Sequence, residues 1–320
     1  MDALTSGFAW AQQLLFECVV QPLLFALGQG NLLEEAYRAT GWVLVGALQV
    51  GVMLTVLRAL ERWRPVEPVT DARAVRVDMV YTLVHRLGLF RLAMFFTLDA
   101  LFLDLASQLR RAGWPTWQLD SLWPGVTDGA LASFLLYLVL FDFVDYWIHR
   151  GQHGLQAWWQ LHALHHSQRQ MTMWSDNRNH LLDDLIRDAI LAAVAIAVGI
   201  APGQFVAVVA VTQLLESLSH ANVRLGFGPV LGRLLVSPGY HRTHHQIGLG
   251  HESAGRGTLG GCNFAVLFPA WDLLFGTARL QPAYGPTGTR DQLPAEGARD
   301  YGRGFWAQQW RGLLRLAGRA

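Results

Sequence analysis

Long runs of apolar residues, interrupted by few charges, are the feature that most constrains this chain. A helix that crosses a bilayer needs about 20 mainly apolar residues. Two segments meet that length, Gly41–Leu60 and Gly129–Ile148, although two aspartates lie in the last two turns of the second. Phe8–Leu27 and Leu87–Ala106 are weaker candidates because they carry more polar residues. The sequence therefore predicts an integral membrane protein with about four transmembrane helices.

The composition agrees with a membrane protein and excludes several other classes. Of the 320 residues, 52% are hydrophobic and 15% are charged, whereas an ordinary soluble domain has roughly 25% charged residues. The formal net charge of +1 gives no support for a nucleic-acid partner. The two cysteines, Cys18 and Cys262, lie far apart and form neither a disulfide framework nor a zinc–thiolate site.

The stretch 189–218 predicts a helical hairpin. Two apolar halves flank the sequence Ala201-Pro202-Gly203-Gln204. Proline and glycine together usually end a helix and turn the chain. We therefore expect the chain to enter the bilayer here and return to the same side. A single kinked span is the alternative interpretation.

Arginine residues predict the orientation in the membrane. Cytoplasmic loops carry an excess of basic residues, and arginines gather in segments 61–86 and 149–187. Both segments are cytoplasmic if the chain starts inside and crosses four times before His149. A hairpin at 189–218 then keeps every later polar segment on the cytoplasmic face. The expected location is a bacterial inner membrane, with the histidine motifs on its cytoplasmic side.

Nine of the 12 histidines fall into dense groups or at the base of the hairpin. On a helix, residues i, i+3 and i+4 share one face, so each group can aim two or three imidazoles at a single point. The nine are His149 and His153 (H-x3-H), His162, His165 and His166 (H-x2-HH), His241, His244 and His245 (H-x2-HH again), and His220 at the end of the return helix.

These histidines predict a site for two metal ions. Neutral imidazole is the commonest nitrogen ligand for zinc, copper, iron and nickel. Eight or more imidazoles exceed what one ion holds, since structural zinc takes four ligands. A zinc-protease motif is missing, because His251-Glu252 has no second histidine at the required spacing. A non-catalytic membrane metal-binding or metal-transport protein remains the alternative. Transport ligands, however, are expected near the bilayer midplane, and these histidines lie just past the apolar segments.

Two metals at a membrane boundary, beside an apolar hairpin, suggest redox chemistry on a lipid. Breaking an unactivated C–H bond needs an oxidant that side chains alone cannot provide, and iron with O2 supplies one. The hydrocarbon would reach the site from the membrane.

Several linked motifs make the chain resemble the fatty acid hydroxylase/sterol desaturase superfamily of membrane di-iron oxygenases over about residues 78–280. The motifs are Asp142-Phe-Val-Asp-Tyr-Trp-Ile-His149-Arg-Gly-Gln-His153, His162-x2-His165-His166-Ser167, Arg178-Asn-His180, His220-Ala-Asn-Val, Ser237-Pro-Gly-Tyr-His241-Arg-Thr-His244-His245, Asn263-Phe and Trp271-Asp-x2-Phe-Gly-Thr277. The resemblance implies two Fe ions held by the histidines of the three groups, with O2 as co-substrate. It also implies electrons from a separate ferredoxin- or cytochrome b5-like donor with its reductase. We expect no fused cytochrome b5 domain, because no His-Pro-Gly-Gly haem motif occurs.

Two possible ligands remain open from the sequence. Family members often carry Arg-x-His-Pro, whereas Leu181 follows His180 here, so His180 is either a ligand or a structural residue. Glu216 lies four residues before His220 and shares its helix face. Glu216 could bind metal, orient His220 or neutralise nearby cations.

Other polar residues are expected around the ligands. Asp145 and Asp142 lie one and two turns before His149, so either carboxylate could accept a hydrogen bond from a ligand imidazole. The alternative is a membrane-edge carboxylate paired with Arg150. Asn263 is expected to brace the site, as is Asp272. His85 and His251 lack partners at ligand spacing and are interpreted as structural.

The sequence thus predicts an all-α integral membrane protein of about four transmembrane helices plus a helical hairpin, capped by a cytoplasmic helical histidine-rich metal domain. We expect N-terminal transmembrane helices and loops over 1–128, a catalytic domain of the fatty acid hydroxylase type over 129–280, and a tail over 281–320. Trp306 and Trp310 in that tail predict an amphipathic helix at the membrane interface, or one that packs on the protein itself. The predicted function is O2-dependent hydroxylation, or desaturation, of a lipid or sterol-like substrate from the bilayer.

Overall fold

The computed structural model describes residues 2–90, 100–249, 252–253 and 258–319. Part of the expected span Leu87–Ala106, and the whole of His251, lie outside the described residues. Within them most of the regular structure is helical, and the strands β1 (Glu252–Ser253) and β2 (Thr258–Leu259) form one short antiparallel pair. The predicted all-α class is confirmed.

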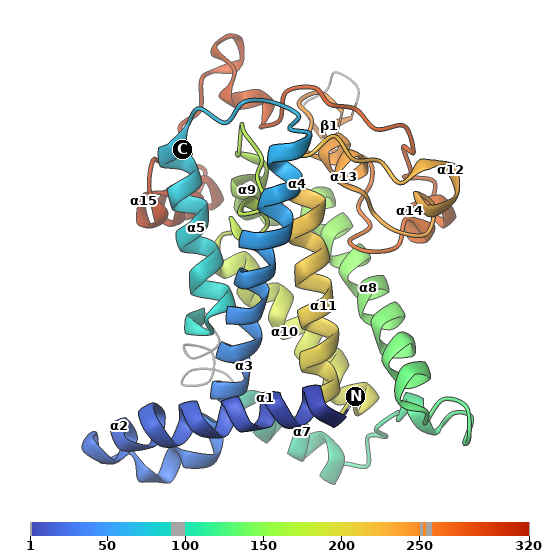
Figure 1. Cartoon of the computed structure of the whole chain (residues 1–320). Coiled ribbons are helices and arrows are strands. Elements are labelled where there is room, and N and C mark those ends of the chain that lie inside the picture. The colour runs from blue at the N-terminus through green and yellow to red at the C-terminus, as the bar shows by residue number, and fades with distance from the viewer. Residues whose placement is uncertain (1, 91–99, 250–251, 254–257, 320) are drawn as a thin grey trace.

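Long helices form an upright bundle beneath a cap of short helices and loops (Figure 1). Three described helical segments are long and apolar enough to cross a membrane: Thr5–Ala26, Gly30–Trp63 and Ala130–Gly154. The second combines α3 (Leu33–Val52), the π-helical turn η3 (Met53–Leu57) and α4 (Arg58–Trp63), and the third includes α8 (Ala130–Gly154). The predicted span Gly41–Leu60 falls within the second segment, and the predicted span Gly129–Ile148 falls within the third except for Gly129, which precedes the helix.

The first helical segment has an orientation that the hydropathy pattern does not reveal. It is built from α1 (Asp2–Leu15), the π-helical turn η1 (Phe16–Val20) and α2 (Gln21–Ala26). In Figure 1 this rod lies across the lower ends of the upright helices, at the opposite end of the molecule from the cap. Many of its apolar side chains are exposed, with Trp10 68% and Phe25 58% accessible.

The expectation of a loop over 61–86 is wrong. Residues Ala72–Arg86 form the helix α5, which packs beside α3, and α7 (Ala100–Arg111) follows. Hydropathy missed α5 because two of its charged side chains, Asp78 and Arg86, are neutralised inside the protein. Asp78 accepts a hydrogen bond from Arg178 at 2.5 Å, and Arg86 donates to Asp176 at 2.7 Å. Both members of each pair are buried, and paired charges are the form in which burial is tolerated.

A glycine allows α3 and α5 to approach each other closely. A Cβ atom added at Gly46 would lie 1.7 Å from the carbonyl oxygen of Arg86. Overpacking of this kind typically costs about 1–3 kcal/mol. We expect Gly46→Ala to lower the thermal unfolding midpoint in detergent. Gly51→Ala is the matched control on α3, because an added Cβ there would meet nothing within 4 Å, and equal behaviour of both variants would contradict the close approach.

The predicted hairpin is confirmed. The helix α10 (Leu181–Val198) ends at Gly199, whose φ of +63° suits glycine, and α11 (Pro202–His220) begins with proline in its first turn. Both outer ends reach the same histidine cluster, since Asp183 on α10 hydrogen-bonds His162 and His220 on α11 contacts His165. The first residues of α10 and the last residues of α11 therefore lie at the same end of the bundle, which excludes the single kinked span.

The cap is built from short elements around the ends of α8 and α11. They are α9 (Gln156–His166), η6 (Ser175–Asn177), α12 (Gly228–Leu231), α13 (Pro238–His244) and α14 (Ala270–Leu274). The helix α15 (Phe305–Leu316) packs on α9. Trp306 and Trp310 of α15 are 76% and 62% exposed, while Gln309 and Arg315 are buried. One face of α15 therefore packs on the protein itself, and the opposite face presents the two tryptophans.

Candidate metal centre

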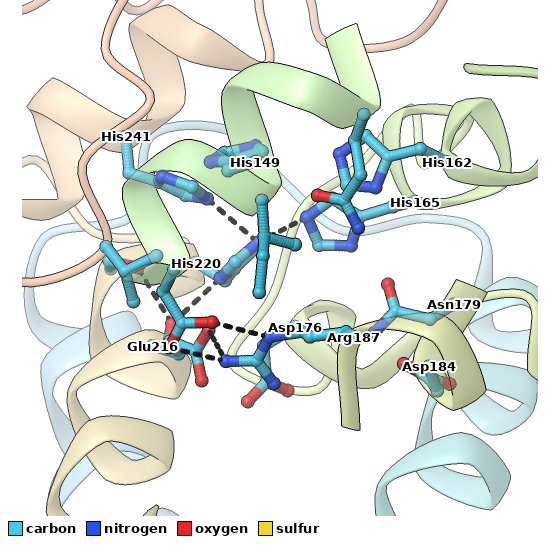
Figure 2. A pocket seen from close by; sticks show the side chains of 15 residues that line it. His149, His162, His165, Asp176, Asn179, Asp184, Arg187, Glu216, His220 and His241 are labelled. Carbon is cyan, nitrogen blue, oxygen red and sulfur yellow. Dashed lines mark hydrogen bonds and ion pairs between the residues drawn. The ribbon is translucent and has the colours of Figure 1, made fainter. Parts of the chain in front are cut away.

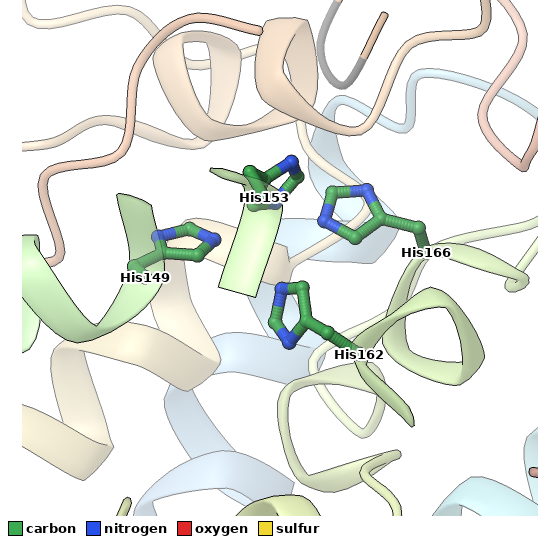
Figure 3. A group of neighbouring side chains, drawn as sticks. All are labelled: His149, His153, His162 and His166. Atoms are coloured by element: carbon green, nitrogen blue, oxygen red, sulfur yellow. The ribbon is translucent and has the colours of Figure 1, made fainter. Parts of the chain in front are cut away.

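Nine buried histidines from four helices meet in the cap. One group comprises His149, His153, His162 and His166, which Figure 3 shows facing a common centre. A second group comprises His165, His220, His241 and His245, and a third set joins His166, His244 and His245. Within each group the candidate ligand atoms all lie within 4.8 Å of one another. We refer to the first two as group 1 and group 2.

The helices α9 and α13 each contribute to more than one group. On α9, His162 and His166 are one turn apart and serve group 1, whereas His165 points into group 2. The expectation that each motif aims two or three imidazoles at a single point therefore holds for His162 and His166, while His165 of the same motif belongs to the other group. Adjacent residues on a helix differ by about 100° in direction, so His165 and His166 diverge toward different centres.

Hydrogen bonds to backbone carbonyls fix the orientation of several rings. The Nδ1 atoms of His149, His244 and His220 lie 2.8, 2.7 and 2.8 Å from the carbonyl oxygens of Phe264, Cys262 and Glu216, respectively. A carbonyl oxygen only accepts, so each Nδ1 carries the proton and donates it. In the neutral ring the lone pair then lies on Nε2, which is the form that a metal ligand needs.

The nitrogen positions in group 2 fit a shared cation. The Nε2 atom of His220 lies 3.1 Å from that of His165 and 3.0 Å from that of His241, whose Nε2 is 3.1 Å from that of His245. In a neutral ring, Nε2 of His241 cannot donate to one neighbour and accept from another, so these contacts are not all hydrogen bonds. Metal–imidazole bonds of about 2.0–2.1 Å place neighbouring nitrogens roughly 3.0–3.4 Å apart.

Group 1 also fits a metal ion. Its members His149 and His162 have buried Nε2 atoms with no hydrogen-bond partner among the described residues. A buried polar atom without a partner costs free energy and calls for an explanation. Coordination to a metal ion would satisfy both atoms.

The histidines of the cap are held in the neutral form that binds metal. Burial, followed by the influence of neighbouring imidazoles, lowers the pKa of His165, His241 and His245 well below the usual range. At neutral pH these rings are uncharged, so each keeps one nitrogen lone pair available.

A cavity of about 70 Å³ lies against both groups. Figure 2 shows five histidines on one side of it and a set of charged side chains on the other. The histidines are His149, His162, His165, His220 and His241, and the charged residues are Asp145, Asp176, Asp184, Arg187 and Glu216. The side of the cavity away from the histidines is therefore polar and predominantly acidic.

Comparison with known proteins agrees with this geometry. Residues 134–277 match the family model described as fatty acid hydroxylase. This part of the chain therefore resembles the fatty acid hydroxylase family. The matched region contains every histidine of the three groups, together with the outer end of α10 and all of α11.

Curated relatives of the fatty acid hydroxylase region have names that refer to lipids. The chain is 31% identical to "Ornithine lipid hydroxylase OlsE" of Rhizobium tropici, over 50% of this chain and 45% of the relative. It is 24% identical to "Methylsterol monooxygenase 1-3" of Arabidopsis thaliana, over 55% and 60%, and 26% identical to "Alkylglycerol monooxygenase" of Caenorhabditis elegans, over 54% and 32%. The matches thus span between about a third and three fifths of these relatives. No solved structure matches the chain significantly.

The two aspartates of α8 in the fatty acid hydroxylase region do not hydrogen-bond a ligand histidine, contrary to the expectation. Asp142 accepts from the backbone N–H groups of Leu267 and Phe268 and from the indole N–H of Trp271. It thereby fastens the loop that follows Phe264 to α8. The sequence predicts that a carboxylate accepts a hydrogen bond from a ligand imidazole such as His149. The carbonyl oxygen of Phe264 accepts from His149 Nδ1 instead.

Asp145 joins α8 to α10. Its two carboxylate oxygens accept from Arg187 at 2.9 and 3.0 Å, whereas Arg150, the expected alternative partner, donates to the hydroxyl of Tyr146. The sequence could not reveal this pair because its members lie 42 residues apart.

Asn263 holds the turn that supplies two of the orienting carbonyls. Its φ is +60°, a left-handed conformation that asparagine tolerates better than most residues. Its side-chain amide donates to the carbonyls of Tyr240 and Arg279 and accepts from the N–H of Arg279. The neighbouring carbonyls of Cys262 and Phe264 are thereby kept in line with His244 and His149.

His180 and Glu216 lie outside the histidine groups. His180 caps α10, where its Nδ1 accepts from the N–H of Leu182 and its Nε2 donates to the carbonyl of Gln309. Both ring nitrogens of His180 are therefore used within the protein. The Glu216 carboxylate lies 3.8 Å from Arg187 at the cavity, while its backbone carbonyl holds His220. Of the three roles left open for the Glu216 side chain, the geometry favours charge compensation, because His220 is held by the backbone carbonyl.

Asp183 is a site residue that the sequence analysis missed. Its carboxylate lies 3.1 Å from Nδ1 of His162 and also accepts from Gln152 and Trp158. The only available signal was a pair of acidic residues in the first turn of the helix, which helix-dipole effects explain equally well.

Asp183→Asn is expected to weaken metal binding in group 1. The carboxylate orients His162 and raises its basicity, and losing such an outer partner typically costs about 10–100-fold in metal affinity. Competition with a chelator, read as metal retained per chain, measures the effect. Asp300→Asn, at an exposed position, should leave retention unchanged, and equal loss in the two variants would contradict this role.

Proposed function

We propose that the chain is a membrane-bound oxygenase that holds two irons and uses O2 and external electrons to hydroxylate a lipid. The observation that carries the proposal is the pair of buried four-histidine groups beside one cavity, in a region that resembles the fatty acid hydroxylase family. The reaction balances as R–H + O2 + two electrons + two protons → R–OH + H2O.

The ligand assignment follows the two groups. Group 1 would hold one iron and group 2 the other, with His244 completing the set between them. When bound, iron supplies the reaction of O2 with a C–H bond, for which no side chain is competent. His180 and Glu216 are not included as ligands, because one uses both ring nitrogens elsewhere and the other faces Arg187.

Residues of this chain orient the ligand imidazoles and form the walls of the cavity in which the reaction would occur. The carbonyls of Cys262, Phe264 and Glu216 hold the imidazoles in one tautomer. The ion pair between Asp145 and Arg187 holds α8 to α10 at the edge of the cavity. Since the histidines are almost fully buried, bulk water reaches the reacting centre poorly, which limits side reactions.

The proposed substrate is a membrane lipid that approaches from the bundle. The cavity lies where the apolar hairpin α10–α11 meets the histidines. Burying a plain hydrocarbon among charged groups is costly, so we place a polar part of the lipid near the charged side and the reacting carbon near the histidines. Hydroxylation is preferred to desaturation because three relatives are named as a hydroxylase or monooxygenases.

Electrons are proposed to come from a separate ferredoxin- or cytochrome b5-like protein with its reductase, acting at the cytoplasmic face. This expectation rests on the family resemblance and on the arginine-rich segments of the sequence.

Labelling with 18O2 tests the proposed function directly. Cells that express the chain or its His165→Ala variant are grown under 18O2, and extracted lipids are compared by mass spectrometry. We expect a lipid carrying one 18O atom only with the unaltered chain. Metal analysis of the purified protein accompanies the experiment. Bound metal without any 18O-labelled lipid, in the presence of a working donor system, would instead favour the metal-binding or transport alternative.

A further inference from the structure

A fifth helix contributes a histidine that no metal group uses. His85 lies near the end of α5, and its Nδ1 is 2.9 Å from the backbone carbonyl oxygen of Tyr81. Its Nε2 is 3.0 Å from Oδ2 of Asp184. The carbonyl only accepts, so Nδ1 of His85 must carry a proton.

The contact with Asp184 requires a second proton. If Nε2 of His85 is protonated, it donates to the carboxylate. If it is not, then the proton lies on Asp184, whose hydroxyl donates to Nε2. Either way, the pair holds one transferable proton and is neutral as a unit. Both side chains are nearly buried, at 11% and 10% exposed, which favours this neutral, proton-bearing state.

The pair borders the cavity beside the metal groups. Asp184 lines that cavity together with His149, His162 and His165, and Figure 2 shows it on the side away from the histidines. The consecutive residues Asp183 and Asp184 therefore have different partners. Asp183 holds His162 of group 1, whereas Asp184 connects the cavity to a histidine outside both groups.

We propose that His85 and Asp184 form a relay that delivers protons to the cavity. This inference rests on the proposed function, whose reaction consumes two protons for each O2 reduced. The Nε2–H bond of His85 breaks as the proton passes to Asp184, which releases it into the cavity toward the oxygen being reduced to water. A hydronium ion from solvent then reprotonates Nε2 and leaves as water, since Nδ1 keeps its proton on the carbonyl of Tyr81. His85 does not touch the reacting atoms. It acts through Asp184, to which it passes the proton, and is therefore a positioning residue.

A purely structural role makes different predictions. In that case the pair only fastens α5 to α10, and a side chain that keeps the hydrogen bond should suffice. Glutamine provides this test, because its amide N–H can donate to Asp184 but does not titrate. Arg76→Gln, an exposed change on α5, is the matched control.

His85→Gln is expected to lower the turnover number by about tenfold. Loss of a direct general acid lowers the rate by about 10²–10⁴-fold, and the smaller effect is expected here because water can partly replace a relay. Added imidazole should restore part of the rate. The unaltered protein should slow as the pH rises and the pair loses its proton, whereas the variant should lack this pH dependence. The charged groups that act on His85 are Asp184 and Asp188 of α10, and Arg86, beside it on α5, is paired with Asp176.

A readout without turnover separates this inference from the proposed function. In metal-free protein with 15N-labelled histidine, the His85 ring signals are followed by NMR, with His85→Gln assigning them. Burial alone would lower the pKa of the His85 ring, but the carboxylate of Asp184 and the hydrogen bonds to Asp184 and Tyr81 raise it above the usual value of about 6.5. We therefore expect a proton to leave the pair above about pH 6.5. Ring signals that stay constant from there to the highest pH at which the protein remains folded would overturn the relay. So would a His85→Gln variant with unchanged metal content, rate and pH profile, although the proposed oxygenase would then still stand.

Discussion

Loss of group 2 metal and of turnover is the expected result of replacing His165 by alanine. Nε2 of His165 lies 3.1 Å from that of His220, so it is part of the nitrogen cluster that would hold the ion. Removing a direct ligand should cost more than the roughly 10–100-fold in affinity that an outer partner costs. Iron per chain, measured after purification in mild detergent, should fall, and 18O-labelled lipid should disappear.

His180→Ala is the matched control, since it removes a buried histidine that lies outside both groups. It deletes the cap of α10 and the hydrogen bond to Gln309. Loss of a helix cap typically costs about 1 kcal/mol, so the unfolding midpoint should fall while the metal content of folded protein stays unchanged. Equal metal loss in the two variants, or full turnover in His165→Ala, would show that the ligand assignment is wrong.

Replacing Asp272 by alanine should disorder the loop around Phe264, whose backbone carbonyls orient His149 and His244. This fully buried carboxylate accepts from the N–H groups of Phe264 and Ala265, the hydroxyl of Tyr240 and that of Thr277, at 2.6–2.9 Å. Asp272→Ala leaves four buried donors without this acceptor, and hydrogen bonds to a charged group are worth about 1.5–3 kcal/mol each. We expect destabilisation by at least about 3 kcal/mol and a loss of metal, because the carbonyl of Phe264 no longer holds His149.

Thermal unfolding and metal content of the purified protein measure this effect. Asp300→Ala changes an exposed aspartate and should shift stability by no more than about 0.5 kcal/mol. An Asp272→Ala protein with an unaltered midpoint and full metal content would mean that other contacts hold the loop.

The sequence predicts the elements that depend on short-range signals. The histidine spacing on α9 and α13 and the Pro-Gly turn of the hairpin act within a few residues, so they are readable without tertiary structure. The apolar runs of α3 and α8 are similarly local. These signals suffice to indicate a helical membrane protein with a cluster of imidazoles at one end of a hairpin.

Features that depend on pairing across the chain could not be predicted. The helix α5 looked like a polar loop because the partners of Asp78 and Arg86 lie about 90–100 residues away. For the same reason the sequence offers a ligand imidazole or Arg150 as the partner of Asp145, and not Arg187, which lies 42 residues away. The partition of α9 between two groups also follows from the position of α13 and α11 around it, which no local pattern contains.

The shared use of α9 links the two metal groups mechanically. His162 and His166 serve group 1 and His165 serves group 2, all from one turn of a single helix. A rotation of α9 therefore moves ligands of both groups together, because the three histidines are fixed relative to one another by the geometry of that helix. Occupancy of the two centres should then be cooperative: the first ion to bind locks α9 at the angle that the second ion needs, so that fully loaded and metal-free chains predominate over half-loaded ones.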